Sequence, residues 1–522
     1  MNASAERRAG RLGPVLLVVA ITIAGAVLRF AAVDFGLPDR CRPDEQFIVE
    51  KAAVLGGTHG FNPRFAMYPA AQTYLDWALG RLAQAIRGER WTLEDPEGRR
   101  RWYLTGRLAS AVMGTLTIPL TAAVAANAAG WPAHPGGLAA VLGAGLLAGT
   151  FLHVRDSHFA TTDVAMTFWA MLAWLAIARV VRRGRLADST VAGALVGLAA
   201  ATKYPAIGLA VPLALAHVLG TRRPLRLAGA AVAVAATFFI ATPYVVLDRA
   251  TTDAAIAMLK GLYVTTGRGG PTGFGWLFGA ALPAAFGWPL AAFLVASIGW
   301  ALVAGGVFAR LLAVWLLVAA YPLVTAHLVM IRYVVPVATV GVALIGAAMA
   351  RLSDRLPGGR IAVALLALVA VAPSVARAIA LDRFLAQTDT RTLARVWMEK
   401  NLPRGTVVYA PAYHPVPVLR FALPEASPPI FRYAPVPDRP PAGAYVLIAD
   451  HPAETDPDHA TPPSLAAALD ARATVLLDVD PFRKPNADGA RYEPLDAFYV
   501  PLWGFDAVER PGPRLRLYRL TS

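Results

Sequence analysis

Two adjacent carboxylates follow the first long apolar run of this chain, in the stretch RCRPDEQF. Asp44 and Glu45 stand just after Arg40 and Arg42, and Pro43 stiffens the backbone that leads to them. Two neighbouring carboxylates can act together as a general base, because one carboxylate accepts the proton while the other orients that proton. The plain alternative is a hydrated loop that happens to contain two acids.

A second polar stretch, HVRDSHFATTD, interrupts the apolar sequence at residues 153–163. It contains Arg155, His158, Asp156 and Asp163 together with three hydroxyl residues. On one continuous helix, Asp156 and Asp163 would share a face. One of these polar groups can be explained as the N-cap of the following helix. The others are candidates for a function.

Two isolated cations complete the set of candidate residues. Only five of the 49 basic residues are lysines, and Lys203 separates two short apolar runs in the sequence ATKYP. Its compact ammonium group suits a phosphate, although a lysine that snorkels to the membrane surface is the alternative. Arg332, followed by Tyr333, begins a later apolar run. It is either a second phosphate contact or an interface anchor.

The elements that must position these residues are membrane helices. The 522 residues are 56% hydrophobic and only 16% charged, whereas soluble domains average about 25% charged residues. A bilayer is crossed by about 20 apolar residues. The first apolar run is also longer than a signal-peptide core, so we expect an uncleaved span. We predict about eleven spans in all, near residues 14–33, 107–128, 137–152, 160–181, 189–202, 204–220, 226–243, 281–303, 310–327, 333–350 and 361–380.

The charge distribution predicts the topology. The net charge of +15 comes from arginines in short loops between apolar runs, which is the positive-inside pattern and not the basic stripe of a nucleic-acid-binding protein. We therefore predict a cytoplasmic N-terminus, no nucleic-acid partner, and an extracytoplasmic C-terminus after an odd number of spans. The polar stretches described above then all lie on the outer side. The single cysteine, Cys41, excludes an intramolecular disulfide.

The composition divides the chain near residue 380. We predict a membrane module over residues 1–380, with an outer loop at 34–106, and an extracytoplasmic soluble α/β domain over residues 381–522. Within the outer loop, residues 68–86 have the helical spacing of an amphipathic helix at the membrane surface. A glycine-rich segment at 262–280 predicts a second outer loop.

At these residues the chain resembles the bacterial GT-C fold glycosyltransferases of the dolichyl-phosphate-mannose–protein mannosyltransferase type, which include the aminoarabinose transferases. The matching pieces are PDEQFIVEKA, YPAAQTYL, RDSHFATTDVAMTF, ATKYP, TPYVVLD and RYVVPV, in that order. The resemblance implies a multi-pass enzyme of the inner membrane and cell envelope. It implies a polyprenyl-phosphate-linked sugar donor and an extracytoplasmic glycan, lipid or protein acceptor.

The resemblance also implies roles for individual residues. Asp44, with Glu45, corresponds to the acidic position beside the sugar-transfer centre. Asp163 corresponds to a further acidic position, with Asp156 as the alternative. Lys203 and Arg332 would hold the donor phosphate. The sugar would then move by a single displacement that inverts the anomeric carbon.

Further residues of the same motifs are expected to contact substrate: Arg155, His158, Tyr204 and Tyr68. No cofactor is certain. The resemblance leaves a divalent metal between the carboxylates open, and no set of oxygen ligands with clear spacing supports one.

Two alternative functions are also compatible with the sequence. A lipid-sugar flippase or transporter would also be polytopic, but it usually shows two related halves and ionisable residues near the bilayer midplane. A related GT-C enzyme that transfers a whole oligosaccharide would use the same residues. The sequence contains no Ser-His-Asp, HExxH, Walker or dinucleotide-binding signature that would favour a hydrolase, ATPase or dehydrogenase.

Overall fold

The computed structural model describes residues 3–130, 137–221, 225–265, 273–327, 329–410, 430–437, 441–452, 463–493 and 499–521. Arg222, Arg223 and residues 266–272 of the predicted glycine-rich loop lie outside this part of the chain. The chain forms two compact units. The first comprises Met1–Val33, Phe47–Ala83 and Thr105–Ile379, and the second comprises Asp34–Gln46, Gln84–Leu104 and Ala380–Ser522.

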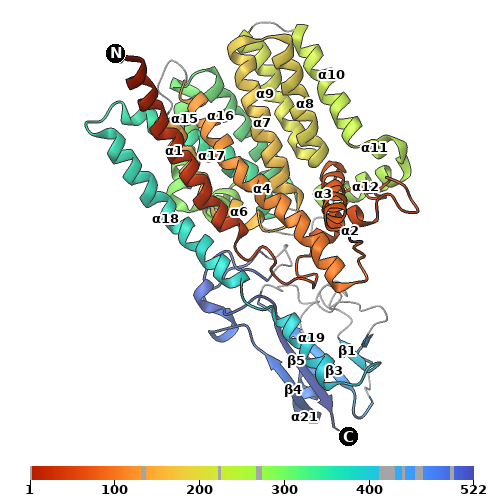
Figure 1. Ribbon diagram of the computed structural model, residues 1–522. Coiled ribbons are helices and arrows are strands. Elements are labelled where there is room, and N and C mark those ends of the chain that lie inside the picture. Colours follow the sequence, from red (N-terminus) through yellow and green to blue (C-terminus); the bar gives the residue numbers. More distant parts are fainter. Residues whose placement is uncertain are drawn as a thin grey trace. The chain divides into compact units, whose positions relative to one another are not determined.

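Helices build the first unit (Figure 1). The long ones are α1 (Ala3–Phe30), α4 (Pro96–Ala128), α7 (Thr162–Arg183), α8 (Leu186–Thr202), α10 (Leu225–Ala241), α15 (Trp288–Ala304), α16 (Val307–Thr325), α17 (Val335–Ser353) and α18 (Gly359–Leu385). Shorter ones are α2 (Gln46–Val54), α3 (Ala71–Arg87), α5 (Gly137–Ala148), α6 (Phe151–Asp156), α9 (Ala210–Leu215), α11 (Tyr244–Leu247), α12 (Arg249–Lys260), α13 (Gly273–Trp276) and α14 (Leu282–Phe286).

Membrane-spanning length is reached by six helices of the described chain, and by seven if the bent pair Gly273–Phe286 and Trp288–Ala304 counts as one span. Four shorter apolar helices lie at Gly137–Ala148, Leu186–Thr202, Tyr204–Leu219 and Leu225–Ala241. All the predicted apolar runs fall on these elements. The chain is therefore a multi-pass membrane protein, while the count of about eleven crossings stays a prediction.

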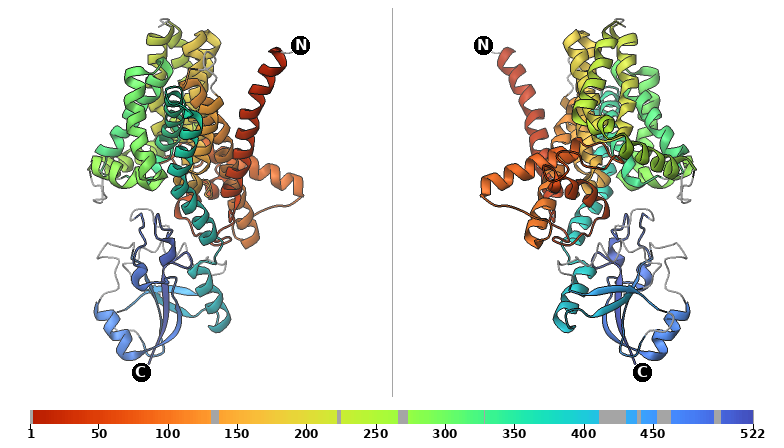
Figure 2. Two further views of the ribbon diagram at one scale, coloured as in Figure 1. Left: turned by 90° about the vertical axis from the view of Figure 1, so that its left-hand side faces the viewer. Right: turned by 90° about the vertical axis from the view of Figure 1, so that its right-hand side faces the viewer.

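Most of the long helices of the first unit run side by side in both views of Figure 2, whereas the N-terminal half of α1, drawn in red, is inclined away from them. Within this bundle α17 is the most enclosed, since 89% of its apolar window is buried. Helix α8 contains a GxxxG sequence that brings it close to α10. A Cβ atom at Gly193 or Gly197 would overlap the carbonyl oxygens of Ala230 or Val234. Small residues at this spacing let the backbones of membrane helices approach each other closely.

Arg29 ties the first helix to the bundle. Its guanidinium is fully buried and donates to the carbonyl oxygens of Leu147 and Ala148, at 3.2 and 3.3 Å. It also lies 3.0 Å from Nδ1 of His153. The carbonyls belong to the end of α5, where a cation is stabilised by the helix dipole. These contacts offset the cost of placing an arginine in an apolar span.

The second unit contains a five-stranded sheet in the order β2-β1-β3-β5-β4. Its strands are β1 (Val407–Ala410), β2 (Arg432–Pro435), β3 (Tyr445–Asp450), β4 (Ala473–Val479) and β5 (Arg514–Leu520). β1 is parallel to β2 and β3, whereas β5 is antiparallel to β3 and β4. Helices α19 (Thr390–Asn401) and α21 (Pro463–Arg472) complete the α/β arrangement that the sequence predicted.

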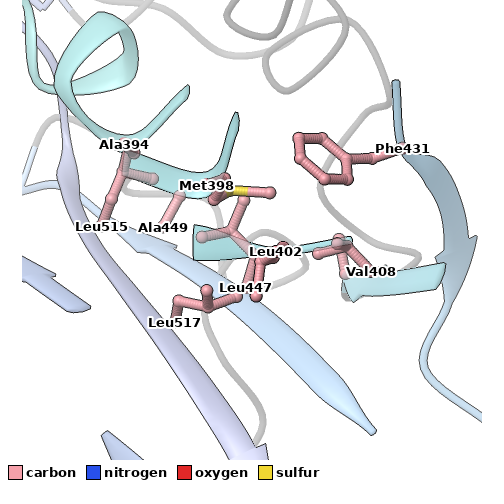
Figure 3. Close-up of a cluster of buried hydrophobic side chains, with 10 residues drawn as sticks. Ala394, Met398, Leu402, Val408, Phe431, Leu447, Ala449, Leu515 and Leu517 are labelled. Atoms are coloured by element: carbon pink, nitrogen blue, oxygen red, sulfur yellow. The ribbon is translucent and has the colours of Figure 1, made fainter. Parts of the chain in front are cut away.

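Alternating side chains of the central strands form a core on each face of the sheet. Leu447 and Leu517 point toward Met398 of α19, as Figure 3 shows. Val446 and Ile448 of the same strand β3 pack instead with Leu469 of α21. Because successive strand residues point to opposite faces, β3 contributes to both cores, and each helix covers one face.

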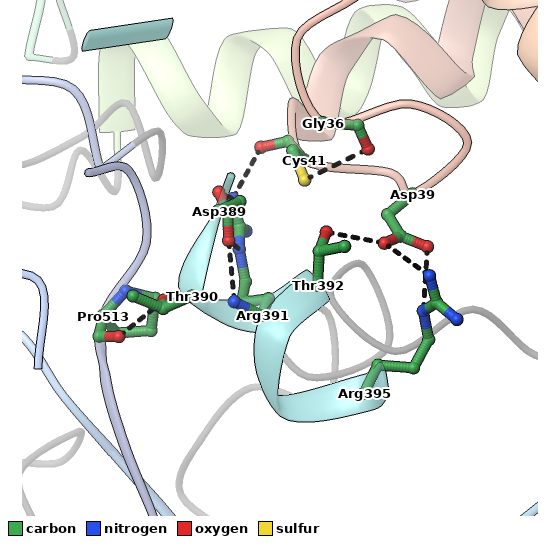
Figure 4. A network of polar contacts seen from close by, with 9 residues as sticks. All are labelled: Gly36, Asp39, Cys41, Asp389, Thr390, Arg391, Thr392, Arg395 and Pro513. Carbon is green, nitrogen blue, oxygen red and sulfur yellow. Dashed lines mark hydrogen bonds and ion pairs between the residues drawn. The ribbon is translucent and has the colours of Figure 1, made fainter. Parts of the chain in front are cut away.

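The second unit also joins two distant parts of the sequence. Residues 34–46, called here the first-loop segment, contact the beginning of α19 (Figure 4). The buried Arg391 side chain donates twice to Asp389, at 2.8 Å each, and once to the carbonyl oxygen of Cys41, at 3.2 Å. Burial lowers the pKa of Arg391, but the charge and hydrogen bonds of Asp389, together with Cys41 and Tyr499, more than compensate and raise the pKa above its ordinary value.

Asp39 provides the other end of this connection. Its buried carboxylate accepts a hydrogen bond from the Thr392 hydroxyl at 2.7 Å and pairs with Nε of Arg395 at 3.3 Å. Burial raises the pKa of Asp39, while the charge of Arg395 opposes the shift. Asp39 and Cys41, the two neighbours of Arg40, thus both contact α19. These contacts fix the backbone that leads to Asp44.

Candidate functional site

Asp163 lies in the first turn of α7. The polar stretch before it does not form one helix: α6 ends at Asp156, and α7 begins at Thr162. Asp156 and Asp163 therefore do not lie on one continuous helix, and the condition for a shared helical face is not met. Thr161 is the N-cap residue, but its side chain makes no capping hydrogen bond. The first turn of a helix is a favourable place for a carboxylate, because the helix dipole is positive there.

Lys203 reaches Asp163 from another part of the bundle. Helix α8 ends at Thr202, Lys203 adopts an extended backbone conformation, and a 3-10 turn follows at Tyr204–Leu209. Pro205 cannot donate a backbone hydrogen bond and disfavours a helical residue before it, which explains the break. The Nζ atom of Lys203 lies 2.6 Å from Oδ1 of Asp163. The predicted break thus directs the ammonium group at a carboxylate.

Arg332 approaches the same carboxylate from the start of the α17 segment. Its Nε atom lies 3.9 Å from Oδ2 of Asp163. The exposed fractions of the Asp163, Lys203 and Arg332 side chains are 3%, 8% and 2%. Two cations meet one carboxylate here, so the three groups together carry one net positive charge. We call them the charged cluster.

Aromatic rings surround the ammonium group of the charged cluster. Nζ of Lys203 lies 4.4 Å from the ring centre of Tyr333 and 5.8 Å from that of Tyr68. The Tyr333 hydroxyl is 2.6 Å from the hydroxyl of Tyr263. Tyr263 is not among the residues predicted to be functional from the sequence, although it lies in the predicted outer loop at 262–280. The rings favour a cation and limit its access to water.

The other predicted substrate contacts are engaged with the protein. The Tyr204 hydroxyl donates to the carbonyl oxygen of Ala66 at 2.9 Å. Both ring nitrogens of His158 lie 2.9 Å from backbone carbonyl oxygens, those of Val154 and Ala31. Arg155 pairs with its neighbour Asp156 at 3.3 Å, and both side chains are buried. Substrate contacts by Arg155, His158, Tyr204 and Tyr68 stay predictions.

Asp44 and Glu45 belong to the second unit, whereas the charged cluster belongs to the first. They form one 3-10 turn, Pro43–Glu45, that leads directly into α2. Asp44 is half-buried, and Glu45 is fully buried. Joint action of this acidic pair with the cluster stays a prediction. So does a metal between the carboxylates, since no group of three metal-ligating side chains occurs within the described ranges.

The bundle with its polar residues at helix breaks has the fold of the GT-C glycosyltransferases, as the motifs predicted. The sequence pattern of the dolichyl-phosphate-mannose-protein mannosyltransferase family matches residues 103–247, a range that includes Asp163 and Lys203. No curated protein sequence matches the chain.

Solved structures with the same fold are glycosyltransferases. ArnT from Cupriavidus metallidurans bound to undecaprenyl phosphate is 16% identical, with a TM-score of 0.56 over 97% of this chain and 98% of ArnT. The Archaeoglobus fulgidus oligosaccharyltransferase in its apo form is 15% identical, with a TM-score of 0.55 over 84% of this chain and 69% of that one. AglB from the same organism, in complex with an inhibitory peptide and a dolichol-phosphate, is 14% identical, with a TM-score of 0.55 and coverages of 82% and 65%.

Proposed function

We propose that this protein transfers a sugar from a polyprenyl-phosphate donor to an acceptor on the outer side of the cytoplasmic membrane, with inversion at the anomeric carbon. The observation that carries the proposal is the charged cluster, in which Lys203 and Arg332 meet at Asp163 in a buried place. The structural similarity to ArnT bound to undecaprenyl phosphate supports a lipid-linked phosphate as the ligand.

The chemistry of the donor fits a cationic site. In the substrate, the phosphate is esterified to both the lipid and the sugar and carries one negative charge. When the acceptor attacks the anomeric carbon, the bond from this carbon to the phosphate oxygen breaks, and the oxygen keeps the electron pair. The departing lipid phosphate thus gains negative charge in the transition state. Lys203 and Arg332 would stabilise this charge, because preorganised cations in a water-poor site lower the barrier most where charge develops.

Asp163 has a positioning role in this scheme. Its carboxylate holds the Lys203 ammonium at 2.6 Å, and the tyrosine rings around it restrict the direction of approach. An ammonium fixed in advance loses little entropy when it binds a phosphate. The base that removes the acceptor proton would be Asp44, with Glu45 completing the acidic pair.

The experiment supplies purified protein with a panel of labelled polyprenyl-phosphate sugars and measures release of the lipid phosphate. We expect Lys203→Ala and Asp44→Asn to lower turnover by about 10² to 10³, the usual loss when a charge-stabilising group or general base is removed. Lys260→Ala and Asp34→Asn are the matched controls, since both residues are exposed. Both controls should retain full activity.

The outcomes separate the parts of the proposal. Normal turnover by Asp44→Asn would overturn the assignment of the base, and normal turnover by Lys203→Ala would overturn the phosphate contact. If the wild-type protein consumes no donor but moves a labelled lipid-linked sugar across vesicles, the chain is a transporter. Transfer of a lipid-linked oligosaccharide in place of a single sugar would identify the oligosaccharide-transferring alternative.

A further inference from the structure

A cavity of about 710 Å³ opens within the first unit, away from the charged cluster. Its walls come from α4, α7, α15, α16, α17 and α18. Three arginines line it, Arg182, Arg351 and Arg355, together with a single acidic residue, Asp354. We call it the arginine cavity. None of its lining residues takes part in the proposed transfer reaction.

The arginine cavity and the charged cluster occupy opposite ends of the same two helices. Asp163 begins α7, and Arg182 lies in its last turn; Arg332 precedes α17, and Arg351 lies in its last turn. Each pair is 19 residues apart. At 1.5 Å per residue this is about 28 Å, close to the thickness of the hydrocarbon core of a bilayer. A charged cluster at one membrane surface therefore places the arginine cavity at the other surface.

The charges of the cavity favour an anion. Within the described part of the chain, the guanidinium groups of Arg351 and Arg355 form no hydrogen bond or ion pair. Gly130, which has a positive φ of 95°, faces Arg351: a Cβ atom there would lie 2.7 Å from one guanidinium nitrogen. The absence of a side chain at Gly130 thus leaves room for this guanidinium. Three arginines against Asp354 give the lining a net charge of +2.

The remaining walls are apolar and aromatic. Phe293 and Trp300 of α15 and Phe308 of α16 line the cavity beside the arginines, and Leu366 of α18 is 41% exposed there. A soluble phosphate would leave the exposed parts of Phe293, Trp300 and Leu366 in contact with water. An amphiphile with a phosphate at its polar end would cover them with an acyl chain.

We propose that the arginine cavity binds an anionic phospholipid of the cytoplasmic leaflet, with the phosphate near Arg351 and Arg355 and an acyl chain along the aromatic wall. Basic pockets between membrane helices on the cytoplasmic side bind such headgroups in other proteins, because the basic residues attract the anionic lipid. The arginine-rich loops from which we predict the cytoplasmic side include those that follow α7 and α17. These are the helix ends at which the arginine cavity lies.

The test is native mass spectrometry of the full-length protein after delipidation in detergent. The probes are dioleoyl phosphatidylglycerol and dioleoyl phosphatidylcholine, which have the same acyl chains and differ in headgroup charge. We expect saturable binding of phosphatidylglycerol at one site, about tenfold tighter than that of phosphatidylcholine. Arg351→Gln combined with Arg355→Gln should abolish this difference.

A control and a second variant keep the test decisive. Arg310→Gln removes an exposed arginine at the start of α16 that does not line the cavity, and it should leave phosphatidylglycerol binding unchanged. Arg355→Gln alone changes only an exposed side chain, so it should weaken binding without affecting folding. Equal binding of the two lipids, retention of the preference in the double variant, or equal loss with Arg310→Gln would overturn the proposal. So would displacement of the lipid by inorganic phosphate at matched concentration, because the site would then recognise a free anion.

Discussion

Asp163 and Lys203 lie 40 positions apart in the sequence and form an ion pair of 2.6 Å in the bundle. A buried ion pair gains Coulomb energy but loses hydration, so its net contribution to stability is small and often unfavourable. Such a pair is therefore weak evidence for a stabilising role. The proposed function offers another explanation, in which Asp163 holds Lys203 in place for the donor phosphate.

His451 shows how strongly burial affects a single residue of the second unit. Its ring packs against Tyr492 and Tyr499, with ring centres 4.5 and 4.7 Å away. Burial, assisted by the charge of Arg391, lowers the pKa of His451 from 6.5 to about 3. The imidazole is therefore neutral in the folded state at every pH above about 3.

This shift predicts a loss of stability in mild acid. Between pH 6.5 and about 3 the unfolded chain binds a proton that the folded chain excludes, so the free energy of unfolding falls as the pH falls. At pH 4.5 His451 alone should remove about 2.5 kcal/mol relative to pH 7. His451→Phe should abolish this part of the pH dependence, as measured by the thermal unfolding temperature at both pH values. An equal pH dependence in the variant and the wild type would contradict the prediction.

At the scale of elements, the first-loop segment and α19 depend on each other. Asp39 connects them through Thr392 and Arg395, and neither partner is near Asp39 in the sequence. Helix α19 contacts the first-loop segment, which contains Asp44. We therefore expect the C-terminal region to help keep this segment ordered.

Asp39→Asn should loosen this contact. The amide can still accept from Thr392 but loses the ionic attraction to Arg395, which we expect to cost about 2 kcal/mol. Limited trypsin digestion measures the result as faster cleavage after Arg40. Asp506→Asn is the control, because it breaks only an exposed pair with Lys484 in the same unit. Equal cleavage rates in wild type and Asp39→Asn would show that the contact does not order the loop.

The close approach of α8 and α10 is a second property of elements that can be tested. Gly193→Ala adds a methyl group where the carbonyl of Ala230 leaves no space, so the helices must separate. Overpacking of this kind costs roughly 1 to 3 kcal/mol. The thermal unfolding temperature in detergent should fall. Gly299→Ala, in α15, has no atom within 4 Å of the new methyl group and should leave the temperature unchanged or raise it.

At the scale of the whole molecule, the orientation in the membrane decides which compartment each polar group faces. The arginine-rich loops predict that Arg183, at the end of α7, is cytoplasmic, and that Arg404, after α19, is outside. Both side chains are exposed, while the native Cys41 is buried.

Single cysteines at these positions should report the orientation in a Cys41→Ser background. In spheroplasts, a membrane-impermeant maleimide should label Arg404→Cys and leave Arg183→Cys unlabelled until the membrane is opened. Labelling of Arg183→Cys in sealed spheroplasts would reverse the predicted orientation. It would also place the arginine cavity in the outer leaflet.

The sequence by itself determined the apolar elements and indicated an α/β region after residue 380, because length, hydropathy and composition are local properties of the chain. It also indicated Asp163, Lys203 and Arg332, since a charge beside an apolar span is costly and therefore conspicuous. Only the tertiary structure decided which of these charges meet, that α6 and α7 are separate helices, and that Arg29 holds α5. It alone revealed the contact between Asp39 and α19 and the cavity around Arg351. These features depend on the packing of side chains that are distant in sequence, and no local pattern records which partners the folded chain brings together.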